Sequence, residues 1–166
     1  VLGRLYADDP AGATALLTAA AADPSWRVRE AVAMAAQRIG DADGDAVAAL
    51  VTAWAAHPDP LVQRAAVAAI CEPRLLRTPA AAATALRTCA TATAALLALP
   101  PSRRREADAR TLRQALGYCW SVAVAADPPA GLPVFTALGG DDPDLAWIVR
   151  TNRTKARLAR LLGDKA

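Results

Sequence analysis

The sequence has little of what most catalytic and metal sites require. It contains one histidine, His57, and its three cysteines, Cys71, Cys89 and Cys119, are far apart in the chain. No Cys-x-x-Cys or His-Glu-x-x-His pattern occurs, which argues against a zinc site and against histidine-based catalysis. The Gly-x-Ser-x-Gly turn of serine hydrolases and the glycine loop of phosphate-binding enzymes are absent as well. We therefore expect no metal and no other cofactor. Whether the protein is an enzyme stays open, and we favour a protein that is not an enzyme.

Aromatic residues are also scarce, at 4%, whereas 45 of the 166 residues are alanine. Alanine is the best helix former and a poor strand former. No segment alternates β-branched and polar residues between turn signals, as a half-buried strand would. With 54% hydrophobic residues the chain can bury a core without disulfides or metals. We expect a single all-α domain over residues 1–166.

Residues 1–9 have neither the basic start nor the apolar core of a signal peptide. The uncharged stretches 88–102 and 114–126 are too short for a membrane helix, and an odd number of scattered cysteines is typical of a reducing compartment. We expect a cytoplasmic protein that does not contact membranes. The chain begins with Val1 rather than methionine, which leaves open a missing N-terminal segment.

Charge is unevenly distributed along the chain. Residues 1–72 carry five arginines and nine acidic residues, a net charge of −4, whereas residues 73–166 carry fourteen basic and seven acidic residues, a net charge of +7. A basic half can indicate an anionic partner, and it is equally compatible with an unevenly charged solvated surface.

Prolines, glycines and aspartates divide the chain into helix-length segments. Asp23, Asp59 and Asp142 each stand just before a proline, and this pattern predicts helix starts because the carboxylate caps free amides while proline lacks the amide that would be unpaired. The predicted helices span residues 10–22, 24–40, 44–56, 59–71, 79–99, 102–126, 130–138 and 142–162.

Some of these segments repeat. Residues 24–31 align with residues 58–65 at an offset of 34 residues, with Val28 matching Val62, and a third copy begins at residue 142. In each copy small residues follow, where neighbouring helices must approach closely. This Asp-Pro-x-x-x-Val-Arg pattern and its alanine-rich helix resemble HEAT repeats, over residues 23–72 and 141–162, and the runs 116–122 and 147–158 resemble small bacterial HEAT-repeat proteins without an assigned activity.

The resemblance implies an α-α superhelix, a right-handed solenoid of about four helix pairs, less regular over residues 73–140. It also implies that the second helices of the pairs line a concave surface that binds a macromolecule. We expect a non-catalytic scaffold with a protein partner rather than DNA, because the basic residues form no continuous stripe in the sequence.

The candidate contacts lie in two segments. In the last predicted helix, spacings of three and four residues place Arg150, Arg153, Arg157 and Arg160 on one face, next to an apolar face that includes Asn152. Such a face can bind phosphates, or it can be an exposed terminal helix with favourable last-turn cations. A second basic run, Arg103–Arg105, is unfavourable at a helix start and suggests either a loop that meets an acidic partner or a solvated loop.

Four of the seven aromatic residues are tryptophans. We expect Trp54 and Trp120 in the core, and Trp26 and Trp147, with Arg29 and Glu30, on the concave surface. This set is similar in outline to the HEAT-like alkylpurine DNA glycosylases, which use groove tryptophans, an arginine and a carboxylate. That resemblance implies DNA binding, with Glu30 as the catalytic candidate, although the family's catalytic Asp within a Trp-rich motif has no counterpart here.

Overall fold

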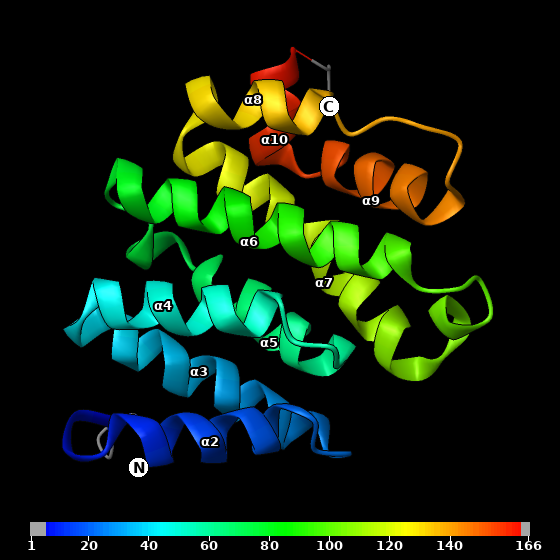
Figure 1. Cartoon of the computed structure of the whole chain (residues 1–166). Helices are drawn as coiled ribbons and strands as arrows, with labels where there is room; N and C mark the ends of the chain where they lie inside the picture. The colour runs from blue at the N-terminus through cyan, green and yellow to red at the C-terminus, as the bar shows by residue number, and fades with distance from the viewer. Residues whose placement is uncertain (1–5, 164–166) are drawn as a thin grey trace.

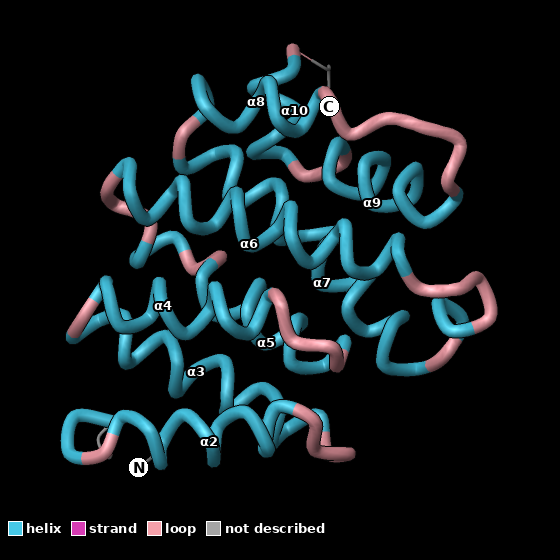
Figure 2. The backbone as a smooth tube through the Cα atoms, viewed as in Figure 1, coloured by secondary structure: helices cyan, strands magenta, loops and turns pink. Residues whose placement is uncertain are grey.

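The structure is a computed structural model that describes residues 6–163, and every regular element in this range is helical (Figure 2). The expected all-α class is confirmed. The α-helices are α2 (Pro10–Ala21), α3 (Trp26–Ala42), α4 (Gly44–Ala55), α5 (Pro60–Ile70), α6 (Pro79–Ala98), α7 (Ala107–Ala126), α8 (Pro128–Thr136), α9 (Pro143–Arg153) and α10 (Ala156–Leu162). Short 3₁₀ turns at Pro73–Leu75 and Arg103–Arg105 precede α6 and α7.

The helices form a stack of four pairs in two layers (Figure 1). The second helices make one layer, in which α3 packs on α5, α5 on α7 and α7 on α9; we call it the inner layer. The first helices, α2, α4, α6 and α8, follow one another from the N-terminal to the C-terminal end of the stack (Figure 1). The short helix α10 is an addition that packs on α7 and α9. The expected helical solenoid is confirmed: α2 to α7 form three packed pairs, and α8 and α9, the last two helices in pair order, each pack on α7.

Capping side chains fix the starts of the helices. The Asp59 carboxylate accepts the Leu61 amide at 2.8 Å, and the Asp142 carboxylate accepts the Asp144 amide at 2.9 Å, each with proline in the first turn. Asp23 accepts the Ser25 amide at 2.7 Å, one residue before α3 begins. The predicted capping roles of Asp59 and Asp142 are confirmed, and each cap stabilises its helix by about 1 kcal/mol. The capping role predicted for Asp23 was wrong, because the N-cap of α3 is Ser25 and no side chain caps this helix.

The core combines small residues between helices with a few large ones. Ala65, Ala66 and Ala69 of α5 are fully buried, which allows close helix approach. Trp54 and Trp120 are buried as predicted, and each indole N–H donates to a threonine hydroxyl of a neighbouring helix, Thr18 at 2.8 Å and Thr93 at 3.0 Å. Burial of a large apolar side chain contributes roughly 1.5–3 kcal/mol, and the satisfied N–H avoids a desolvation cost.

Two predicted helices are interrupted, and these predictions were wrong. The helix expected over 102–126 starts only at Ala107, after the 3₁₀ turn. The helix expected over 142–162 is broken between Arg153 and Ala156 into α9 and α10. At the break the Thr154 hydroxyl donates to the Thr151 carbonyl at 2.8 Å, a local bond that competes with helix continuation. The turn buries Leu158 completely, so tertiary packing favours the break.

Asn152 joins α9 to α7 at the centre of the C-terminal pairs. Its side-chain amide donates to the carbonyls of Leu116 and Ile148, both at 2.8 Å, and its oxygen accepts the Ser121 amide at 2.9 Å. The residue is completely buried, so all these bonds are shielded from water. The amide that the sequence places in the apolar face of its helix thus satisfies backbone groups of α7, in the middle of that helix.

Helix α6 is long and apolar enough to cross a membrane by length and composition alone, and in the structure half of that stretch is buried inside the stack. This pattern is the one expected of a core helix.

Candidate interaction surface

The predicted contact residues lie at opposite ends of the helix stack. Trp26, Arg29 and Glu30 lie in the first turns of α3, Trp147 lies on α9, and Arg157 lies on α10. Helices α5 and α7 separate α3 from α9 in the layer (Figure 1). The structure therefore does not bring the tryptophans together into one patch.

On α3, in the inner layer, three large apolar side chains are exposed, and Trp26 and Met34 are more exposed than Val28. Trp26 is 61% exposed and Met34 is 51% exposed, and the Arg27 guanidinium lies 4.9 Å from the centre of the Trp26 ring. Residues 26, 30 and 34 are spaced by four and so are neighbours along one helix surface. We call Trp26, Arg27, Glu30 and Met34 the α3 patch. The tryptophan was a sequence prediction; Met34 was missed, because its exposure depends on how α3 is oriented in the stack.

Glu30 forms an ion pair between consecutive repeats. Its carboxylate accepts a hydrogen bond from Arg64 Nη2 of α5 at 2.7 Å, and the two residues are the 34-residue equivalents of each other. Arg64 Nη1 also donates to the Arg29 carbonyl at 3.3 Å. The carboxylate proposed for catalysis is thus neutralised by an arginine of the same chain.

Arg29 is held against the backbone that precedes α3. Its Nη1 donates to the carbonyls of Asp23 at 2.6 Å and Pro24 at 2.8 Å, so its guanidinium closes the α2–α3 turn. A side chain bound in this way stabilises the turn in which the repeat motif lies.

Trp147 is half-buried between α7 and α9. Its ring lies under the Arg113 guanidinium, 4.6 Å from the ring centre, and against Gly117, where an added Cβ would come within 2.7 Å of the ring. Gly117 therefore supplies the space that the indole occupies. These contacts assign Trp147 to an interface between repeats, so it contributes little to an exposed aromatic surface.

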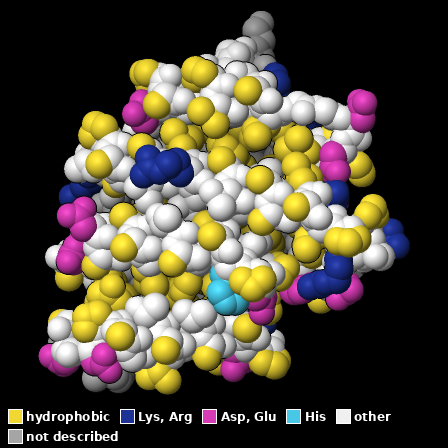
Figure 3. Space-filling model, viewed as in Figure 1, with side chains coloured by type: hydrophobic (Ala, Val, Ile, Leu, Met, Phe, Trp, Pro, Cys, Tyr) yellow, Lys and Arg dark blue, Asp and Glu magenta, His cyan; other side chains and the backbone are white. Residues whose placement is uncertain are grey.

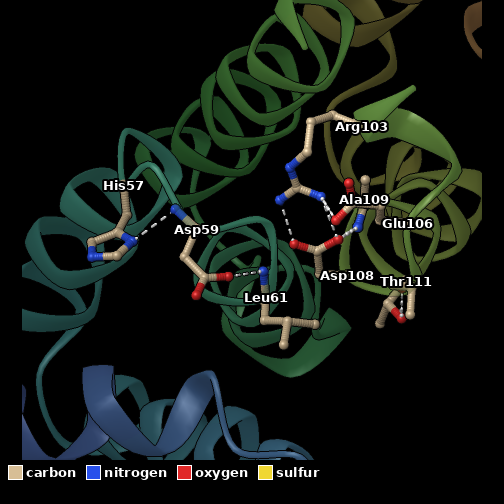
Figure 4. A network of polar contacts seen from close by, with 9 residues as sticks. His57, Asp59, Leu61, Arg103, Glu106, Asp108, Ala109 and Thr111 are labelled. Carbon is tan, nitrogen blue, oxygen red and sulfur yellow. Dashed lines mark hydrogen bonds and ion pairs between the residues drawn. The ribbon is translucent and has the colours of Figure 1, made fainter. Parts of the chain in front are cut away.

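The basic run at Arg103–Arg105 is mostly paired inside the chain. Arg103 bonds Glu106 and Asp108, each at 2.7 Å, at the same edge as the turn in which His57 accepts the Asp59 amide (Figure 4). The hydrogen bond from Arg103 lowers the pKa of Asp108, against the opposing effect of burial.

Arg104 fastens the α6–α7 loop to the start of α9. It binds the Asp142 carboxylate and donates to the carbonyls of Leu97 and Leu99. Burial raises the pKa of Asp142, but hydrogen bonds from Arg104 and from backbone amides outweigh it and leave the pKa below its ordinary value. The guanidinium that the sequence suggested for a partner therefore has a structural role.

Arg105 and Arg110 are exposed, and neither has an ion-pair partner among the described residues. Together with Arg104 and Arg113 they border a hollow of about 490 Å³ that also includes Asp142 and Asp144. Because Asp144 pairs with Arg113 at 2.7 Å, much of the local charge is already neutralised.

The predicted arginine stripe is divided by the break between α9 and α10. Arg150 and Arg153 stay on α9 beside a cleft, whereas the Arg157 guanidinium lies 4.9 Å from the centre of the Tyr118 ring and donates to the Tyr118 hydroxyl at 2.8 Å. The expectation of a single continuous face was wrong, because the Thr154 turn changes the direction of the helix. Tyr118, 46% exposed on α7, was missed by the sequence reasoning.

The three cysteines, scattered in the sequence, meet in the core. Cys71 and Cys89 sulfurs are 3.7 Å apart, Cys119 Sγ lies 3.5 Å from the Val67 carbonyl oxygen, and all three thiols are free and buried. The interaction with Cys71 and burial raise the pKa of Cys119 well above its ordinary value. Among residues 6–163 no group of His, Cys, Asp or Glu has an arrangement that could hold a metal ion.

Comparison with known protein families gives a match for the N-terminal part of the chain. The family model described as HEAT repeats matches residues 1–71. No curated protein and no solved structure matches the chain.

Proposed function

We propose, from the match of residues 1–71 to HEAT repeats and from the helix stack, that the protein is a non-catalytic scaffold that binds a protein partner. The binding surface is the inner layer, the face that we expect to be concave. Stacked helix pairs bury a continuous core and leave one long surface open, which suits them to macromolecular partners.

The observation that supports this proposal is the α3 patch. Trp26 and Met34 expose large apolar surfaces that no neighbouring helix covers, on the first helix of the inner layer. Trp, Met and Arg are enriched in protein–protein interfaces, where a few of them provide most of the binding energy. Tyr118, with Arg157 stacked on it, adds a second aromatic contact on α7.

The alternative is a DNA-binding protein of the alkylpurine glycosylase type. The comparisons offer no support for it, and Glu30 is paired with Arg64 instead of being available to stabilise a sugar cation. A cytoplasmic location is part of the proposal, supported by the three free thiols, since unpaired cysteines are typical of reducing compartments.

Affinity capture from a lysate of the source cells, with quantitative mass spectrometry, tests the scaffold. We expect specific proteins bound by the wild type to be reduced at least about tenfold by the double variant W26A/M34A, because hot-spot truncations cost roughly 2 kcal/mol or more. The matched control is Leu16→Ala, since Leu16 is 58% exposed on α2, which is a first helix and not part of the inner layer. Equal capture by W26A/M34A and wild type would contradict the inner-layer surface.

Fluorescence anisotropy with a labelled DNA duplex tests the alternative. We expect no binding at low salt. Micromolar binding, with a slope of log affinity against log salt of about −3 or steeper, would show contacts to several phosphates and would replace the protein-partner proposal. Release of an alkylated base that is lost in Glu30→Gln would establish catalysis.

A further inference from the structure

The C-terminal end of the stack carries a cleft that the α3 patch does not involve. It lies between the loop that joins α8 to α9, the outer side of α9 and the start of α10, and has a volume of about 750 Å³. The loop arches from the end of α8 to the start of α9 (Figure 1), and apolar side chains are visible in the hollow beneath it (Figure 3). The apolar wall consists of Leu138, Leu145, Val149 and Ala159.

The cleft has one sign of charge. Arg150 and Arg153 are the charged residues among the described residues that line it, and no carboxylate is among them. Both residues are exposed on the last turns of α9, so their guanidinium groups border the apolar wall. Arginine binds carboxylates in a bidentate geometry, so the lining complements an occupant that is apolar with an adjacent acidic group.

The cleft is also open along one side. Gly139, Gly140, Ala146 and Thr154 line it and are exposed. A small ligand placed there would remain partly in water, whereas an extended chain can place a side chain in the cleft and continue out of it. The volume lies within the range of about 300–1,000 Å³ typical of ligand sites and exceeds that of a single side chain.

We propose that this cleft docks a short segment of a protein partner in which a large apolar side chain lies next to Asp or Glu. The inference deepens the proposed scaffold function, on which it rests, by naming the chemistry of one partner segment. The apolar side chain packs on Leu145 and Val149, and the carboxylate pairs with Arg150 at the rim.

The test is selection of a displayed random-peptide library on the full chain. We expect the enriched peptides to share a Leu, Ile, Phe, Met or Trp next to Asp or Glu. Enrichment without an acidic residue, or no enrichment, would overturn the proposal. Titration of decanoate against a bound fluorescent peptide distinguishes a peptide ligand from a small amphipathic acid. Displacement of the peptide by decanoate at comparable concentrations would assign the cleft to a small amphipathic acid instead.

Four variants locate the site. Ala146→Trp fills the open side of the cleft from an exposed position, and Ala94→Trp places the same ring at an exposed position of α6. Arg150→Glu reverses the rim charge, and Arg77→Glu makes the same change before α6. We expect at least about tenfold weaker peptide binding for A146W and R150E, with A94W and R77E within twofold of wild type. Equal binding by A146W and wild type would exclude the cleft.

The outcomes separate this inference from the scaffold proposal. Loss of peptide binding in A146W but not in W26A/M34A assigns the peptide to the cleft. If lysate capture is lost in W26A/M34A while no peptide is enriched, the scaffold stands and the cleft inference fails. If peptides bind the cleft and capture is unaffected by W26A/M34A, the inner-layer surface fails instead.

Discussion

Between Pro10 and Cys71 the stack consists of two helix pairs with helices of 11–17 residues, whereas after Cys71 α6 and α7 each extend over 20 residues. The first region follows the 34-residue repeat, matches the HEAT family model and is acidic. The second region has one copy of the motif, at residue 142, after long helices that do not follow the repeat. It is basic, and buried or half-buried polar side chains such as Asn152 and Arg104 join its elements.

The comparison shows two ways of holding a helix stack together. In the N-terminal region the equivalent positions of the repeats meet each other, and small residues such as Ala65 and Ala66 allow close packing. The polar links between its helices are single bonds, such as those from Trp54 to Thr18 and from Gln37 to the Ala68 carbonyl. In the C-terminal region long helices, an interrupted α9–α10 segment and a loop have no equivalent positions to match. Specific hydrogen bonds then fix how these elements dock, so single polar substitutions should cost more there.

The largest effect is expected for Asn152→Leu. The substitution leaves the Ser121 amide and the Leu116 carbonyl without their buried partner, and unsatisfied buried groups cost about 1–3 kcal/mol each. We expect the free energy of unfolding in urea to fall by roughly 3 kcal/mol. The N-terminal match is Gln37→Leu, which removes one bond to the Ala68 carbonyl at 3.2 Å and should cost about 1 kcal/mol or less. Equal losses would contradict the contrast between the regions.

Arg104→Met should follow, with a loss of about 2 kcal/mol near neutral pH, because it removes charge-assisted bonds to Asp142 and to two carbonyls. The lowered pKa of Asp142 means that this contribution is complete above the ordinary carboxyl pKa and is lost as pH falls through the folded-state value. Unfolding curves of both proteins from pH 7 to pH 3 check this. The difference between them should shrink with acid; a constant difference would show that the pair with Asp142 contributes nothing and that the carbonyl bonds and packing of Arg104 account for the loss.

The cysteine cluster lies where the two regions meet and gives a smaller effect at alkaline pH. Its raised pKa values keep the thiols protonated in the folded chain, while the unfolded chain loses those protons as pH rises past the ordinary thiol pKa. Stability should therefore decline in that alkaline range. In the native protein a thiol-specific disulfide reagent should react at least about 100-fold more slowly than in urea, because buried protonated thiols are inert. Rapid labelling of native Cys89 would show that the junction opens readily.

The smallest effect is expected for Glu30→Gln. The pair with Arg64 joins two repeats at 2.7 Å, but the glutamate is 48% exposed, and exposed ion pairs contribute about 0.2–1 kcal/mol. We expect a decrease of about 0.5 kcal/mol in the free energy of unfolding, reduced further by salt. Arg38→Gln, at an exposed α3 position, is the control. A loss above 2 kcal/mol would contradict the contrast, because an ion pair in the N-terminal region would then stabilise the fold as much as the polar links of the C-terminal region do.

Much of the fold could be predicted because its signals are local. Alanine content, the Asp-Pro caps at Asp59 and Asp142 and the 34-residue spacing each depend on neighbours in the chain, and they predicted the class, the helix starts and the pairs. The candidate site was less predictable. Trp26 proved exposed, but Trp147 packs on Gly117, and the arginine face of the last helix is divided at Thr154.

By itself, the sequence determined an all-α chain of capped helices that must stack, since each helix has an apolar face too large for its own pair to cover. Only the tertiary structure decided which polar side chains are free. Arg104 and Arg105 are adjacent and chemically identical, yet one is held by Asp142 and the other is exposed. The difference arises because the partners come from elements distant in sequence, and their positions depend on the packing of the whole stack.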